Sequence, residues 1–259
     1  LTGGEPLVRK GLPDLLGKIK RISGIEQVTL TTNGILLKNQ LDELMRQGLD
    51  AVNISIDTLD ETCYHTVTRC GELNQALEGL QAALEYPNLR VKLNCVPYIQ
   101  MAEYAKEHPV EVRFIEMMPL GMGKACQGKS RDELLELLEK ALGNAEPYEK
   151  HLGNGPAEYV SFSGFQGRIG FISAVSHKFC DSCNRIRLTA EGYLKLCLQY
   201  ESGIDLRKLL RSGATDEELK EAMRQAIWKK PACHNFSDER RDEEVGQKKE
   251  HRAMYGIGG

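Results

Sequence analysis

The sequence has no apolar run close to the ~18–20 residues that a helix needs to cross a bilayer, which argues against a membrane protein. It also has no excess of positive charge. The net charge at pH 7 is −3, which argues against a general nucleic-acid-binding protein. The first residues do not show the pattern of a secretory signal peptide, so we do not expect a secreted protein. We therefore expect a cytoplasmic protein with neither nucleic acid nor a membrane among its partners.

A fourth cysteine is missing from the most cysteine-rich stretch, KFCDSCNRIRLTAEGYLKLCL. The cysteines of this stretch, Cys180, Cys183 and Cys197, are spaced as C-x2-C-x13-C, although the chain contains 8 cysteines in all. In a protein without a secretory signal, clustered cysteines indicate metal or redox chemistry rather than disulfides. We therefore expect this segment to hold a metal centre.

Two interpretations of the three-cysteine segment remain open. A structural zinc site needs four ligands, and the fourth would be Cys233, His234 or His177. The alternative is an iron–sulfur cluster held at only three irons, because catalytic metal sites keep an open position and structural ones do not. Arg185 and Arg187 favour the open cluster, since their fork-shaped cationic groups suit phosphate held beside the metal.

In the first half of the chain, short β-rich segments alternate with helical patterns. The expected strands cover residues 28–34, 51–57, 89–96 and 110–118, and the expected helices cover 12–22, 36–48 and 72–86. This alternation predicts a parallel sheet, either barrel-like or doubly wound. Polar residues stand where the strands end, and in α/β barrels the active site lies at those ends.

The second half has a different character and follows a Gly-rich linker at residues 121–128. Its expected elements are a helix with the capping box Ser130–Glu133, β segments over 158–176, and a helix with the capping box Thr215–Glu218. We therefore expect residues 1–124 to form a partial barrel and residues 125–259 to form a C-terminal α+β region that carries the three cysteines.

Six motifs in sequence order carry a resemblance to a known family. They are LTGGEP, TTNG, VNISIDTL, VKLNCV, RFIEMMPLG and FCDSCNRIRLTAEGYLKLCL, and the chain ends in Gly258-Gly259. Together they resemble the molybdenum cofactor biosynthesis protein A family, the GTP 3′,8-cyclases of the radical S-adenosylmethionine (SAM) superfamily. The resemblance covers essentially the whole chain. The last motif is highly specific, whereas GGEP alone indicates only the wider superfamily.

The resemblance implies an α/β fold, an incomplete (β/α)6 TIM-like barrel of the radical SAM type, covered by a C-terminal domain. It implies two [4Fe–4S] clusters and SAM as cofactors. The N-terminal cluster splits SAM to a radical that abstracts the 3′ hydrogen of GTP, and closure onto guanine C8 gives 3′,8-cyclo-7,8-dihydro-GTP. This is the first step of molybdenum cofactor biosynthesis. A homodimer is also implied, as is a next pathway enzyme that makes cyclic pyranopterin monophosphate.

The resemblance also implies roles for individual residues. The C-terminal cluster is held by Cys180, Cys183 and Cys197, and its free iron binds the purine of GTP. The other matched positions are Thr31, Lys92, Arg185, Ile186 and Arg187 for GTP, and Gly4, Ser55 and Met118 for SAM. The ending Gly258-Gly259 resembles a flexible tail that inserts toward the active site. Without the resemblance, Lys92 could equally be a solvated side chain and Met118 a core residue.

The chain departs from the family in two respects. The C-x3-C-x2-C motif that binds the radical-generating cluster is absent, so no catalytic residue is assigned. With the non-methionine start, this predicts a fragment without its first strand, which should bind GTP but not initiate radical chemistry. The connection over residues 97–109 is also shorter than usual, which predicts a trimmed loop or a helix that begins late.

Two other functions fit parts of the sequence. One is a different radical SAM enzyme with an auxiliary cluster, which would not need the two-arginine segment. The other is a zinc-stabilised binding module on an α/β scaffold. A GTP titration separates the first from a GTP cyclase, and metal analysis of anaerobically prepared protein separates the second.

Overall fold

A computed structural model describes residues 1–69, 71–96, 99–120, 123, 128–150, 152–236, 248–252 and 254–257. The chain divides into two compact units. The first unit comprises Leu1–Glu116 with Gly128–Ser173, and the second comprises Met117–Gln127 with Ala174–Gly259. The expected boundary between residues 124 and 125 lies outside the described residues, as does the Gly258-Gly259 ending.

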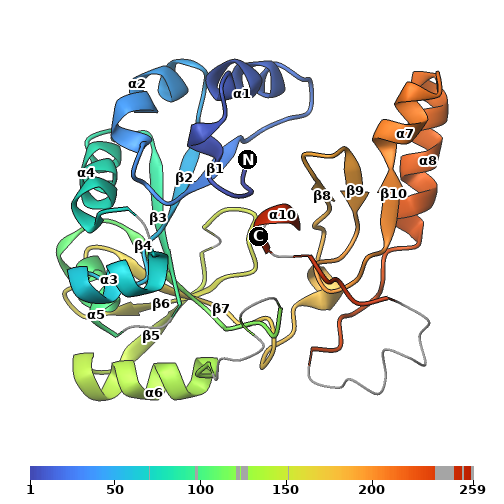
Figure 1. Ribbon diagram of the computed structural model, residues 1–259. Helices are drawn as coiled ribbons and strands as arrows, with labels where there is room; N and C mark the ends of the chain where they lie inside the picture. The colour runs from blue at the N-terminus through green and yellow to red at the C-terminus, as the bar shows by residue number, and fades with distance from the viewer. Residues whose placement is uncertain are drawn as a thin grey trace. The chain divides into compact units, whose positions relative to one another are not determined.

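The first unit is built on a seven-stranded sheet with the order β1-β2-β3-β4-β7-β6-β5 (Figure 1). Its strands are β1 (Thr29–Thr32), β2 (Ala51–Ser55), β3 (Arg90–Cys95), β4 (Glu111–Ile115), β5 (Ala145–Tyr148), β6 (Glu158–Phe162) and β7 (Arg168–Ile172). Strands β1 to β4 and β7 pair in parallel, whereas β5 and β6 are antiparallel. This is an α/β fold with a mainly parallel sheet.

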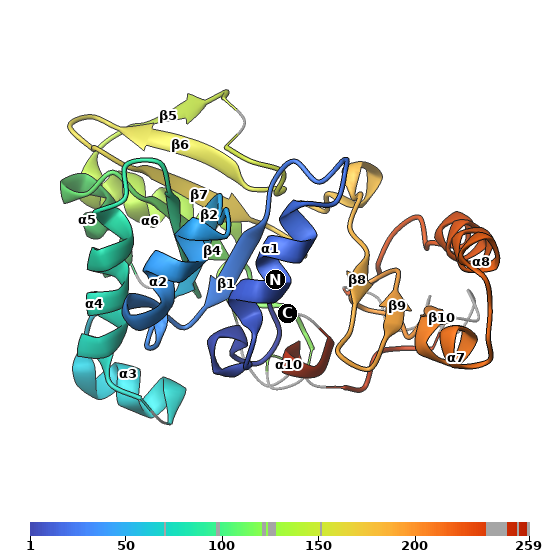
Figure 2. The same cartoon turned by 90° about the horizontal axis from the view of Figure 1, so that it is seen from above.

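Helices cover one face of this sheet (Figure 2). They are α1 (Leu12–Lys20), α2 (Leu37–Arg46), α3 (Glu61–Thr68), α4 (Leu73–Leu84), α5 (Gln100–Glu107) and α6 (Arg131–Leu142), preceded by the 3-10 turn η1 (Pro6–Val8). Apolar residues recur every three or four positions, as Leu37, Leu41 and Leu44 do in α2, and form one buried stripe. These stripes pack on the sheet residues Leu30, Val52, Ile54, Leu93, Val112 and Ile169, all fully buried.

Residues 128–173 were expected in the C-terminal region, but they lie with the sheet of the first unit. The reason is strand pairing. Strand β7 adds in parallel beside β4, and the β5–β6 pair continues the sheet from β7. Backbone hydrogen bonds therefore place this segment in the first unit, although its Gly-rich, antiparallel character resembles a separate domain.

The second unit contains a three-stranded antiparallel sheet with the order β10-β9-β8. Its elements are η3 (Cys180–Ser182), β8 (Arg187–Leu188), β9 (Tyr193–Lys195), β10 (Gly203–Asp205), α7 (Leu206–Arg211), α8 (Asp216–Trp228) and α10 (Met254–Ile257). Both predicted capping boxes are confirmed, Ser130–Glu133 before α6 and Thr215–Glu218 before α8. No helix within the described ranges is both long and apolar enough to span a bilayer.

Candidate functional site

The three clustered cysteines of the second unit line one cavity of about 70 Å³. Cys180 begins the turn η3. The backbone N–H of Cys183 donates to the Cys180 carbonyl at 3.0 Å, which closes the turn and places both cysteines on the same loop. Cys197 approaches from a different element, the loop that follows β9. The fold therefore brings cysteines from two separate loops to one cavity.

Positive charge surrounds the cysteine cavity. Lys230 Nζ lies 3.4 Å from Cys183 Sγ and donates to the carbonyl of Arg185 at 2.7 Å. Burial alone would raise the pKa of the Cys183 thiol, but the Arg185 backbone N–H and the Lys230 ammonium hold that pKa below its ordinary value. The cavity therefore favours at least one thiolate, the form that binds metals.

The two arginines of the NRIR segment also line this cavity. The Arg185 guanidinium lies over the Phe179 ring, 5.2 Å from its centroid. Burial lowers the pKa of Arg187, and the nearby Cys197 and Cys183 partly offset this effect. Ile186 points elsewhere and is 40% exposed, so alternation along the chain directs only the arginines to the cavity.

The donor set fits an iron–sulfur cluster, because thiolates are the ligands of such clusters. Among the residues that the structure describes, no group of three or more His, Cys, Asp or Glu side chains is placed to hold a single metal ion. Of the three candidates for a fourth zinc ligand, Cys233 and His234 line the cavity, whereas the exposed His177 does not. Met118 lines it too, so this predicted SAM residue lies in the second unit beside the cysteines.

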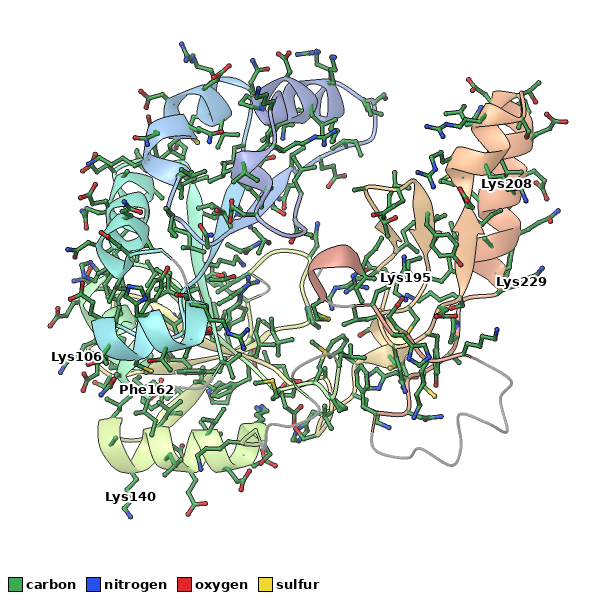
Figure 3. The ribbon with its side chains drawn as sticks, in the orientation of Figure 1. Lys106, Lys140, Phe162, Lys195, Lys208 and Lys229 are labelled. Carbon is green, nitrogen blue, oxygen red and sulfur yellow. The ribbon has the colours of Figure 1, made fainter. Side chains whose placement is uncertain are left out.

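The loop that carries Cys197 is held by a buried lysine at its base. This lysine is Lys195, at the end of β9 (Figure 3). Its Nζ donates to the carbonyl of Tyr200, which closes the loop between them, and lies 2.5 Å from Glu250 Oε2. The side chains of Lys195 and Glu250 are fully buried. At the same loop, Gln199 Oε1 accepts a hydrogen bond from the Asn235 backbone N–H at 2.6 Å. These contacts fix the position of Cys197.

The face of the first unit's sheet opposite the helices is polar, and the predicted GTP residue Lys92 lies on it. Strand register aligns Thr31, Asn53, Lys92 and Glu111 in one row. Lys92 is 5% exposed, and its ammonium lies 2.5 Å from Glu111 Oε2. Burial lowers the pKa of Lys92, and the adjacent Glu111 carboxylate partly offsets this effect. This lysine is an ion-paired cation, not a solvated side chain.

Other polar groups on this face form a hydrogen-bonded chain across the strands. The Arg113 guanidinium donates to Asn94 Oδ1 at 2.9 Å and to Asn53 Oδ1 at 2.7 Å. Asn53 in turn donates to the hydroxyl of Thr31 at 3.1 Å, and the Tyr159 hydroxyl donates to Glu111 at 3.0 Å. This network holds the buried Arg113 guanidinium in place, and a guanidinium is a cation suited to phosphate.

The remaining predicted residues lie at the carboxyl ends of strands or beside them. Ser55 is the last residue of β2 and is exposed. Gly4 is exposed and has φ +47, a left-handed backbone that glycine adopts without strain. Glu5 accepts hydrogen bonds from the Thr32 hydroxyl and the Asn33 backbone N–H, both at 2.8 Å. The GGEP segment is therefore fixed beside TTNG.

Four polar residues of these sites were not expected from the sequence, namely Glu111, Arg113, Tyr159 and Lys230. Glu111 and Arg113 alternate with apolar residues in VEVRF, and that alternation was the available signal for a polar sheet face. Tyr159 and Lys230 had no such signal, since they reach these sites only through pairing and packing.

We expect Gly170→Ala to destabilise the first unit by about 1–3 kcal/mol, because an added Cβ would lie 2.7 Å from Tyr159 Cε1 and 3.1 Å from Arg113 Cγ. Gly155→Ala is the matched control, since its Cβ would meet nothing closer than 4.0 Å. Urea unfolding of both variants checks this. Equal midpoints would show that the polar face is not closely packed at Gly170.

Known proteins similar to this chain cover both units. The family model described as Radical SAM superfamily matches residues 1–119, and the one described as Molybdenum Cofactor Synthesis C matches residues 110–236. A GTP 3′,8-cyclase from Clostridium perfringens (strain 13 / Type A) is 45% identical over 267 residues, covering 100% of this chain and 80% of that protein. Another from Desulforamulus reducens is 40% identical, covering 95% of this chain and 79% of that protein.

A solved domain of pyruvate-formate lyase-activating enzyme from Bacteroides vulgatus ATCC 8482 is more distant. It is 19% identical with a TM-score of 0.42, covering 53% of this chain and 90% of that domain. The assignment therefore rests on the sequence relatives and the two family models. By these, the chain belongs to the GTP 3′,8-cyclase family of the radical SAM superfamily.

Proposed function

We propose that Cys180, Cys183 and Cys197 hold a [4Fe–4S] cluster with one iron left open, and that this iron receives the purine of GTP in the 3′,8-cyclase reaction. The observation that carries the proposal is the shared cavity. It is lined by the three thiols, by Arg185 and Arg187, and by the Lys230 side chain. An anionic cluster and an anionic nucleotide both need such cations nearby.

In this proposal Arg185, Ile186 and Arg187 form the GTP-contacting segment of the second unit. The polar sheet face of the first unit contributes Thr31 and Lys92, whose ammonium is paired with Glu111 and can exchange that partner for phosphate. Gly4, Ser55 and Met118 contact SAM, and the sheet is the incomplete (β/α)6 barrel of radical SAM enzymes. A homodimer and transfer of product to the enzyme that makes cyclic pyranopterin monophosphate stay predictions.

The hydrogen-atom abstraction is supplied by SAM with the N-terminal cluster of the family, and these 259 residues carry no C-x3-C-x2-C motif for that cluster. What the described residues do is bind and orient. The cysteines would hold the second cluster, the arginines beside them would neutralise phosphate, and the buried scaffold around Cys197 would keep this cavity in place. Positioning of this kind lowers the entropic part of a barrier.

Anaerobic reconstitution followed by iron counting and GTP titration tests this function. We expect about four irons and four sulfides per chain and measurable GTP binding. Arg187→Gln should weaken GTP binding at least about tenfold, because a charge-assisted hydrogen bond contributes about 1.5–3 kcal/mol. Arg211→Gln, at an exposed arginine of the same unit, should leave binding unchanged. One zinc per chain, or equal GTP affinity of the Arg187 variant and wild type, would refute the proposal.

A further inference from the structure

His234 is a buried histidine on the wall of the cysteine cavity whose ring has no hydrogen-bond partner in the described structure. Its side chain lines the cavity together with the three cysteines, and the residue is 8% exposed. Neither Nδ1 nor Nε2 has a hydrogen-bond partner among the described residues. Buried polar atoms are nearly always paired in folded proteins, so these two nitrogens indicate a ligand in the cavity.

The position of this ring is fixed by contacts that leave at least one nitrogen available, since only the Ala174 backbone and that of His234 itself lie near its nitrogens among the described residues. The backbone N–H of His234 donates to Cys180 Sγ at 3.5 Å, and the ring packs against Phe236 with centroids 4.3 Å apart. The next residue, Asn235, is tied through its backbone N–H to Gln199 Oε1 at 2.6 Å. The imidazole is therefore held on the cavity wall before any ligand arrives, which reduces the entropy lost on binding.

The chemistry of the ring distinguishes two partners within the cavity. A neutral imidazole has one donor and one acceptor nitrogen. Cluster sulfur can only accept, and Cys180 already receives the backbone N–H of the same residue. Guanine, by contrast, carries acceptors at O6 and N7 and donors at N1 and N2. A guanine N1–H or N2–H can therefore donate to the acceptor nitrogen of His234, which cluster sulfur cannot do.

We infer that His234 is a purine-positioning residue that hydrogen-bonds to the base of GTP. The inference rests on the proposed function, because it takes GTP as the ligand of this cavity. It adds a specificity determinant to the NRIR segment: the arginines bind phosphate, which all nucleotides share, whereas His234 contacts the base. No such role followed from the sequence, where His234 was only one of three candidates for a fourth zinc ligand.

The test compares GTP with inorganic tripolyphosphate, which has the same phosphate chain but no base. Both are titrated into reconstituted wild type, His234→Ala and His234→Gln. We expect His234→Ala to bind GTP about three- to tenfold more weakly, as loss of one neutral hydrogen bond predicts, with tripolyphosphate binding and iron content unchanged. His234→Gln keeps a donor and an acceptor, so it should recover part of the GTP affinity.

Each other outcome overturns the inference. If His234→Ala weakens both ligands equally, or binds GTP like wild type, the ring does not contact the base. If either variant loses iron, His234 acts on the cluster instead. If wild type binds iron but not GTP, the proposed function fails together with the inference. If wild type binds both iron and GTP but the His234 variants do not behave as expected, only the inference fails and the proposed function stands.

Discussion

Replacement of Cys183 by alanine is expected to remove most of the iron from the reconstituted protein, from about four irons per chain to below one. Three cysteines already leave one iron without a protein ligand, so removing one of them leaves the cluster with only two protein ligands. Binding of GTP should fall in parallel, because the open iron is lost with the cluster. Iron and sulfide analysis together with the visible absorption spectrum checks this expectation.

Cys233→Ala is the matched control for this experiment. Cys233 lines the same cavity and is exposed, but in our account it is not a ligand. Its variant should therefore retain the iron and the GTP affinity of wild type. If both variants lost their metal, the site would have four protein ligands and no open iron, as a closed zinc or cluster site does.

Glu250→Ala is expected to destabilise the second unit by about 3–5 kcal/mol, because it leaves the Lys195 ammonium buried without its counter-ion. The lysine also closes the loop that carries Cys197, so hydrogen exchange of that loop should become faster. Glu221→Ala, which breaks the exposed Arg224–Glu221 pair, is the control and should change stability by less than about 1 kcal/mol.

The same buried pair predicts a pH dependence of stability. Burial alone would raise the pKa of Glu250, but hydrogen bonds from Arg252 and Lys195 lower it from 4.5 to about 2. A lowered carboxyl pKa stabilises the folded state above pH 4.5, and this contribution is lost as the pH falls from 4.5 towards about 2. The test is to measure the stability of wild type, which has the ion pair, and of the double variant Lys195→Met/Glu250→Leu, which lacks it, as the pH is lowered.

The double variant should be less sensitive to pH below 4.5 and more stable than Glu250→Ala, since apolar side chains can replace a buried ion pair with little loss. If Glu250→Ala were as stable as wild type and unfolded in acid at the same pH as wild type, the Lys195–Glu250 pair would not fix the Cys197 loop.

Much of the first unit could be predicted because local patterns and the final contacts agree. The β-rich segments 28–34 and 110–118 contain β1 and β4, and the amphipathic pattern of 36–48 contains α2. The two capping boxes could also be predicted, because each is formed by residues only three positions apart. Helix α3 was not predicted, since Glu61–Thr68 has a weak apolar periodicity and only Tyr64 is buried. Helix α5, with eight residues, occupies the shortened connection.

The candidate site was predictable only where a motif carried it. The spacing of the three cysteines and the two arginines between them were visible in the sequence. The partner of Lys195 was not, because Glu250 lies 55 residues away and nothing in either local pattern requires the pair. The contact of Lys230 with Cys183 and the position of His234 depend in the same way on how the segment after α8 packs against the loops that carry Cys183 and Cys197.

The most direct test of the account is nuclear hyperfine spectroscopy of the reduced, reconstituted protein with ¹⁵N-labelled GTP. We predict a coupling between the cluster and a guanine nitrogen that appears when the labelled nucleotide is added and is absent with tripolyphosphate. A spectrum that GTP leaves unchanged, or coupling to a fourth protein side chain that GTP does not displace, would contradict the claim that three cysteines leave one iron open for substrate.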